Sequence, residues 1–176
     1  MKKKWIIGIA VFIGVFLLVF FLYKLEIIPH MAYDNAHFNI PVYTSSIDKD
    51  NDGIDDQTDM LKSAREYLAT KPKYKSQYYG SGYPDDEYGV CTDVVSFALL
   101  HSGYDIMNLL HEDVVQNRDA YQIELVDKNI DFRRVRNLQN YFQRHLISLT
   151  TDTLDIAAWQ GGDIVVYETH IGLVSD

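Results

Sequence analysis

The chain opens with a long uncharged hydrophobic segment, residues 5–23, which differs sharply from the polar sequence after it. As a helix rising 1.5 Å per residue, this segment would be about 28 Å long, close to the ~30 Å hydrocarbon core of a bilayer. It is longer than the apolar region of a typical signal peptide, and no A-x-A-like cleavage site follows it. Residues 1–24 therefore predict an uncleaved membrane anchor, with a cleaved signal peptide as the alternative.

The charges beside this segment predict its orientation. Residues 2–4 are three lysines, whereas one lysine, Lys24, follows the segment and an acidic residue comes soon after. Because positive charge is retained on the cytoplasmic side of a membrane, we expect a single-pass protein with a cytoplasmic N-terminus. The rest of the chain would then be extracytoplasmic.

An acidic loop, residues 48–59, follows a stalk of irregular pattern over residues 25–47. With residue 48 as position 1, carboxylates occupy positions 1, 3, 5, 9 and 12, and a glycine occupies position 6. Oxygen ligands that alternate around a glycine turn suit a Ca²⁺ ion, and the loop resembles those of dockerins and thrombospondin type 3 repeats. The alternative is a solvated acidic turn. We predict a structural Ca²⁺ ion and no organic cofactor; the ligands would be Asp48, Asp50, Asp52, Ile54 (through its carbonyl), Asp56 and Asp59.

Beyond this loop, the hydrophobic pattern predicts helices first and strands near the C-terminal end. Apolar residues recur at helical spacing in residues 60–70 and again from residue 91 to a glycine at 103. Two apolar segments, near 163–168 and 170–175, are typical of adjacent antiparallel strands. The expected fold class is α+β, with a cysteine-bearing helix packed on a small antiparallel sheet in a domain of residues 60–176.

Composition excludes several classes of function. The formal charge is −9, and the lysines around the first segment leave the rest of the chain more acidic still. Nucleic acid is therefore not expected as a partner, because phosphate binding needs clustered Lys and Arg. A hydrophobic content of 47% argues against a disordered chain. The chain has one cysteine, which excludes an intrachain disulfide framework.

That cysteine, Cys91, is the candidate nucleophile. A cysteine on the first turn of a helix lies where backbone N–H groups and the helix dipole stabilise a thiolate. Among the six histidines, His170 is the best candidate base, because it begins a strand-like segment after another strand. The alternatives are a buried structural cysteine and a hydrogen-bonded turn histidine. Asp93 should point away from the thiol and pair with an arginine at 133 or 134.

Four segments resemble, in order, the domain-of-unknown-function family 1287: GYPDDEYGVCTDVV, GYDIMNLLHEDV, NIDFRRVRNL with YFQRH, and WQGGDIVVYETHIGLVSD. That family belongs to the papain-like superfamily of cysteine peptidases and amidases, alongside the NlpC-type cell-wall hydrolases. The resemblance implies a papain-like core in which Cys91 is the nucleophile, His170 the general base and His111 a structural or groove-lining residue. It also implies a third, orienting residue beyond residue 176, so we expect the domain to lack its C-terminal strands.

These patterns predict a membrane-tethered, extracytoplasmic cysteine hydrolase, an amidase or peptidase. Its partners would be the membrane, through residues 5–23, and an amide substrate in cell-wall peptide or protein. Tyr79 and Tyr83, in the tyrosine-rich loop before the cysteine, are expected to line the substrate groove. Two alternatives remain open: a non-catalytic papain-like binding module at the cell surface, and an acyltransferase that uses the same Cys–His pair.

Overall fold

The computed structural model describes residues 2–25, 27 and 33–175, which form two compact units, residues 1–39 and residues 40–176. Residues 40–47, which we expected in the stalk, belong to the second unit. There the Tyr43 N–H donates to Gln160 Oε1 at 3.0 Å, and the Ser45 N–H donates to Asp55 Oδ1 at 3.2 Å.

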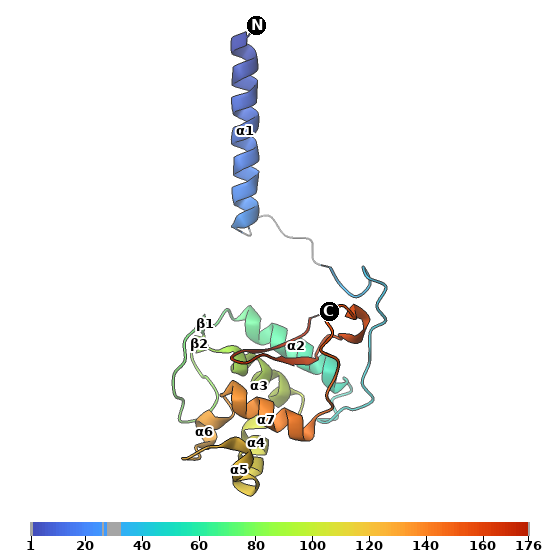
Figure 1. Cartoon of the computed structure of the whole chain (residues 1–176), viewed down its shortest axis with the longest axis vertical. Coiled ribbons are helices and arrows are strands. Elements are labelled where there is room, and N and C mark those ends of the chain that lie inside the picture. The colour runs from blue at the N-terminus through green and yellow to red at the C-terminus, as the bar shows by residue number, and fades with distance from the viewer. Residues whose placement is uncertain (1, 26, 28–32, 176) are drawn as a thin grey trace. The chain divides into compact units, whose positions relative to one another are not determined.

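The first unit is dominated by one helix, α1 (Lys2–Lys24) (Figure 1). Its segment Lys4–Lys24 has a mean hydropathy of 3.0, and its apolar side chains are exposed. An exposed helix of this length and composition is long and apolar enough to cross a membrane.

The centre of the second unit is a pair of helices, α2 (Asp56–Ala69) and α3 (Cys91–His101), which pack against each other. The Asp55 side chain accepts a hydrogen bond from the Thr58 N–H, which starts α2 earlier than the expected residue 60. Met60 and Ala64 on α2 meet Val95 on α3 in the core. The expected helix that begins at the cysteine is confirmed.

Four further helices form the other side of this core: α4 (Ile106–Gln116), α5 (Arg118–Tyr121), α6 (Lys128–Asp131) and α7 (Val135–His145). They pack through an apolar stripe on α4 and the apolar face of α7. The fully or nearly buried residues of these two faces are Ile106, Leu110, Val114, Leu138 and Phe142. A short 3₁₀ helix, η1 (Ile156–Ala158), precedes the C-terminal strands.

Two small sheets complete the unit. Strands β3 (Ile164–Val166) and β4 (Ile171–Leu173) are antiparallel, as expected, and β4 packs against α3. Strands β1 (Lys73–Tyr74) and β2 (Tyr88–Gly89) pair in parallel, which the sequence pattern had not indicated. The described chain is therefore a mixed α+β structure with one apolar N-terminal helix.

A buried ion pair joins α3 to the segment before α7. The Arg133 Nε and Nη2 atoms donate to the two carboxylate oxygens of Asp93 at 2.7 and 2.8 Å, and both side chains are almost fully buried. Arg133 Nη1 also donates to the Gln77 carbonyl at 2.6 Å, and the guanidinium stacks 4.9 Å from the ring centroid of Tyr79. This geometry confirms the expected pairing of Asp93 with an arginine.

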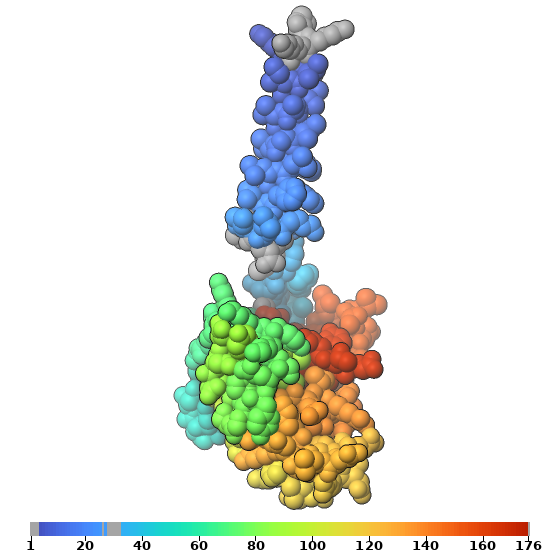
Figure 2. All heavy atoms as spheres, turned by 90° about the vertical axis from the view of Figure 1, so that its left-hand side faces the viewer, coloured from blue at the N-terminus to red at the C-terminus, as the bar shows by residue number. Residues whose placement is uncertain are grey.

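This pairing also positions the loop of residues 75–87. Figure 2 shows that loop (green) on the surface of the second unit beside the yellow and orange segments of residues 120–145. The Asn129 Nδ2 atom donates to the Gly80 carbonyl at 2.8 Å, which adds a second tie between these segments.

We expect Arg133→Met to destabilise the second unit by about 3–5 kcal/mol, because it leaves the Asp93 carboxylate buried without its counter-charge. The measurement is urea unfolding followed by circular dichroism. Lys73→Met is the control, because the Lys73–Glu87 pair is mostly exposed and solvent screening leaves it little effect on stability. Equal effects of the two substitutions would contradict this account of the Asp93–Arg133 pair.

A second charged cluster joins α4 to α7. The Asp113 carboxylate accepts hydrogen bonds from Arg144 Nε at 2.8 Å, from the Tyr121 hydroxyl and from His145 Nε2 at 3.2 Å. The hydrogen bonds from Arg144 above all, and then those from Tyr121 and His145, hold the pKa of Asp113 far below its usual range. The negative charge of Asp113 therefore stabilises the folded state wherever this carboxyl is ionised.

This cluster predicts a loss of stability in acid. A carboxyl whose pKa is depressed by folding contributes its full stabilisation above its unfolded pKa of about 4, and loses it progressively as the pH falls below that value. Asp113→Asn should therefore lower the free energy of unfolding at pH 7 and flatten its dependence on pH below about pH 4. Urea unfolding across this pH range tests it; identical pH profiles for the two proteins would refute it.

Candidate functional site

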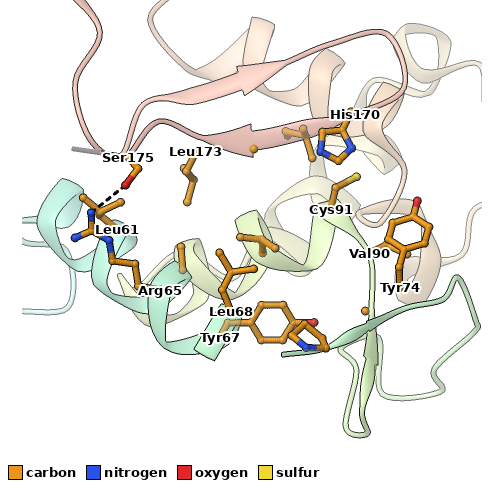
Figure 3. Close-up of a pocket in the computed structure, with 16 residues that line it drawn as sticks. Leu61, Arg65, Tyr67, Leu68, Tyr74, Val90, Cys91, His170, Leu173 and Ser175 are labelled. Carbon is orange, nitrogen blue, oxygen red and sulfur yellow. Dashed lines mark hydrogen bonds between the residues drawn. The ribbon is translucent and has the colours of Figure 1, made fainter. Parts of the chain in front are cut away.

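The candidate site is a cavity of about 410 Å³ between α2, the β2–α3 junction and β4 (Figure 3). Most of its wall is apolar. The aliphatic and proline side chains in that wall are Leu61, Ala64, Leu68, Pro72, Val90, Val94, Ile171 and Leu173.

Cys91 lies at one end of this cavity, as the first residue of α3. Val90 before it is extended, with φ −133° and ψ 173°, and its N–H donates to Asp93 Oδ2 at 2.8 Å. Asp93 therefore fixes the backbone on the N-terminal side of the cysteine. Cys91 is half-buried, and Figure 3 shows its sulfur directed toward the imidazole of His170.

His170 reaches the same cavity from the β3–β4 turn. The turn is closed by a 2.8 Å hydrogen bond from the Tyr167 N–H to the His170 carbonyl. The next residue, Ile171, is 1% exposed and belongs to the hydrophobic core. Burial of Ile171 against α3 thus holds the otherwise exposed His170 next to the start of that helix. The orienting residue expected beyond residue 176 lies outside the described residues.

Several wall residues were not identified from the sequence, among them Arg65, Tyr67, Tyr74 and Ser175. Arg65 Nη2 donates to the Ser175 hydroxyl at 3.0 Å at the end of the cavity away from the cysteine (Figure 3). No motif marks these residues. Helical spacing places Arg65 near Leu61 and Leu68 on α2, but only the packing of β4 turns that part of the helix into a cavity wall.

Tyr67 is an unusual member of this wall. Its hydroxyl is buried and has no hydrogen-bond partner among the residues the structure describes. Burial, and to a smaller extent the charge of Asp93, raises the pKa of Tyr67 to about 12. A Cβ atom on Gly89 would lie 2.1 Å from this hydroxyl oxygen, so a larger residue there would have to displace the end of the Tyr67 side chain.

The three predicted substrate-binding residues lie away from this cavity. Tyr79 is 6% exposed, and its hydroxyl donates to Asp86 Oδ1 at 2.7 Å. The Tyr83 hydroxyl donates to Asp105 Oδ1 at 3.2 Å, and its ring packs against Phe132.

His111, the third, lies on α4, and its Nδ1 atom is buried without a hydrogen-bond partner in the described part of the chain. The structure thus brings Cys91 and His170 together but not these three residues, whose side chains are buried in, or packed against, other parts of the unit. Tyr67 and Tyr74 provide aromatic surface in the cavity instead.

The acidic loop contains a possible cation site at the start of α2. One oxygen from each of Asp48, Asp50 and Asp52 lies within 4.8 Å of the others. The glycine at position 6, Gly53, has φ +93°, a conformation that favours glycine. Asp56 differs from the expectation, because its carboxylate accepts hydrogen bonds from the Lys49 N–H at 2.7 Å and from the Tyr104 hydroxyl.

Comparisons with known proteins show a curated relative and the family of this chain. The chain is 39% identical over 114 residues to the uncharacterized protein YijF of Escherichia coli strain K12, an alignment that covers 60% of this chain and 55% of that protein. The chain thus spans about half the length of the curated relative it matches. No solved structure matches significantly. Residues 61–176 match a domain of unknown function, DUF1287, and the chain therefore belongs to that family.

Proposed function

We propose that the second unit is a thiol hydrolase of amide bonds with a papain-like arrangement of nucleophile and base. One observation carries this proposal: Cys91 and His170, far apart in the sequence, line the same cavity, with the sulfur directed toward the imidazole (Figure 3). A thiol and an imidazole at one opening are the pair that nucleophilic catalysis at a carbonyl requires.

The reaction would proceed through a thioester. His170 takes the proton of the Cys91 thiol, and the sulfur attacks the carbonyl carbon, whose π electrons move to the oxygen. As the C–N bond breaks, His170 returns the proton to the leaving nitrogen. Water then attacks the thioester while His170 takes its proton, and the products are a carboxylic acid and the free thiol.

The start of α3 would stabilise the oxyanion of this reaction. The first N–H groups of a helix have no intrahelical acceptors, and they carry the positive end of the helix dipole. The N–H of Cys91 itself is one of these groups. These N–H groups would be held in position to stabilise the negative charge that develops on the carbonyl oxygen during the attack. Stabilising that charge in the transition state accelerates the reaction.

The substrate we propose is cell-wall peptide on the outer side of the membrane. Its support is the apolar α1, the three lysines at the start of that helix, and the resemblance to the NlpC-type hydrolases. The apolar wall of the cavity suits an aliphatic side chain beside the scissile bond.

The first test is chemical. We expect Cys91→Ala to reduce hydrolysis of cell-wall peptides at least about a thousandfold, with an unchanged thermal midpoint, because the nucleophile is lost. His170→Gln should slow alkylation of Cys91 by iodoacetamide at neutral pH, since the thiol loses its base. His101→Gln is the matched control, because this exposed histidine lies at the other end of the same helix.

Two results would oppose the proposal. If both histidine variants alkylate at the wild-type rate, His170 does not act on the thiol, and a binding module becomes the better account. If peptides are consumed with an amine in place of water as the second reactant, the domain is an acyltransferase. Mass spectrometry of the products distinguishes hydrolysis, which gives a free carboxylic acid, from acyl transfer, which gives a new amide.

The orientation of the anchor can be tested separately. Alkaline phosphatase, which is active only outside the cytoplasm, should be active when fused after the last residue of the full chain in Escherichia coli. Replacing the three lysines at the start of α1 with glutamates, while adding lysines after Lys24, should reduce that activity, because it reverses the charge difference across the helix. An inactive fusion to the unaltered chain would contradict the proposed topology.

A further inference from the structure

Strand β4 has one edge that pairs with no other strand in the described part of the chain, because its sheet contains β3 and β4 alone. The His170 carbonyl accepts a backbone hydrogen bond from the opposite segment at 2.8 Å, and the Val174 N–H donates one to it at 2.9 Å. Inward- and outward-pointing residues alternate along an antiparallel pair, so Gly172 also faces β3. The N–H and C=O groups of Ile171 and Leu173 therefore point away from β3.

This free edge borders the cavity that holds Cys91. His170, all of β4 and Ser175 line the cavity, and β3 lies on the other side of β4 (Figure 3). At a rise of about 3.3 Å per residue, the edge extends about 16 Å from His170 to Ser175, which is room for about five residues of an extended chain. A Cβ atom on Gly172 would have nothing within 4 Å, so the backbone is openly accessible at the middle of the strand.

The walls around this edge are apolar and only partly covered. Leu68 is 52% exposed and Tyr74 is 78% exposed, although both line the cavity. Backbone N–H and C=O groups beside an apolar surface are unfavourable unless they form hydrogen bonds. An extended peptide supplies both of the missing contacts, because its backbone pairs with the strand edge and its side chains cover the apolar wall.

We propose that the free edge of β4 binds the peptide substrate as an added strand. The proposal rests on the thiol hydrolase proposed above, and it narrows the substrate to an extended run of about five α-linked residues. The peptide backbone bonds to the N–H and C=O groups of Ile171 and Leu173, and alternate side chains enter the apolar cavity. Because this edge begins at His170, a peptide held on it brings a carbonyl to the Cys91 sulfur. That continuity favours substrate over a second copy of the chain as the occupant.

The first test scans the backbone of a bound peptide. The probe is an acetylated and amidated hexapeptide of alternating valine and serine, titrated calorimetrically into the full-length Cys91→Ala chain in detergent. N-methylation of one residue at a time removes one N–H group. At every second residue, where the N–H bonds to β4, it should weaken binding at least about tenfold, and at the residues between them less than about twofold.

Two proline substitutions, each added to Cys91→Ala, identify the edge. Leu173→Pro removes an N–H group from the free edge and should abolish the alternating pattern. Ile164→Pro is the matched control, because Ile164 lies opposite Leu173 in the register and its N–H points outward from β3. It should keep the pattern. Proline is tolerated where the N–H lies outside the ladder, and thermal midpoints show whether each variant is folded. The scan of the parent chain does not depend on either variant.

Several results would overturn the proposal. These are no binding at millimolar peptide, a scan without alternation, and a folded Leu173→Pro variant that keeps the alternation. A dimer in sedimentation experiments that Leu173→Pro abolishes and Ile164→Pro keeps would assign the edge to a second copy instead.

Failure of this proposal is distinguishable from failure of the proposed hydrolase. If the scan alternates but the wild-type chain hydrolyses no cell-wall peptide, the edge is a peptide-binding site and the hydrolase is wrong. If cell-wall peptides are hydrolysed but the scan does not alternate, the hydrolase stands and the role of the β4 edge is wrong.

Discussion

The buried pair of Asp93 and Arg133 is the interaction on which the candidate site depends most. Asp93 accepts from the Val90 N–H, and so holds the residue before Cys91, while its other contacts go to the guanidinium. Arg133 in turn binds the Gln77 carbonyl and stacks on Tyr79. One ion pair thus joins the start of α3 to the loop of residues 75–87 and to the segment before α7. Because a buried charge without its partner is so unfavourable, these three segments can be expected to form together, with the cysteine at their junction.

The histidine is positioned by a different force, the burial of apolar side chains. Ile171 is inserted in the core, and its neighbour His170 is therefore carried to the mouth of the cavity although it is itself exposed. The antiparallel register places Ile171 opposite Val166, so the turn between them has little freedom to shift. A one-residue slip would exchange the two faces of the strand, and the imidazole would lose its place beside α3. Electrostatics thus fixes Cys91, the proposed nucleophile, and hydrophobic packing fixes His170, the proposed base.

Whether a feature could be predicted from the sequence depends on how far apart in the chain its contacting residues lie. Helix α3 and the β3–β4 pair could be predicted, because their hydrophobic periodicity and glycine stops are local signals. The pairing of Asp93 with an arginine could be predicted because helical geometry directs the Asp93 side chain away from the Cys91 thiol. By contrast, Tyr79 and Tyr83 looked like groove residues because they are aromatic and near the cysteine, but their hydroxyls bond to Asp86 and Asp105. The true walls of the cavity come from α2 and β4, which only tertiary packing brings together.

Helix α2 connects the acidic loop of residues 48–59 to the cavity that holds Cys91 and His170. Its first turn bears Asp56 and Asp59, which belong to the acidic loop, and the following turns bear Leu61 and Leu68, which line the cavity. Carboxylates at a helix N-terminus are favoured by the helix dipole, so the loop and the helix stabilise each other even before an ion is considered. The helix is also held at this end by Gln57, which donates to Asp163 just before β3. The first turn of α2 is thus joined both to the acidic loop and, through Gln57, to the residue before β3.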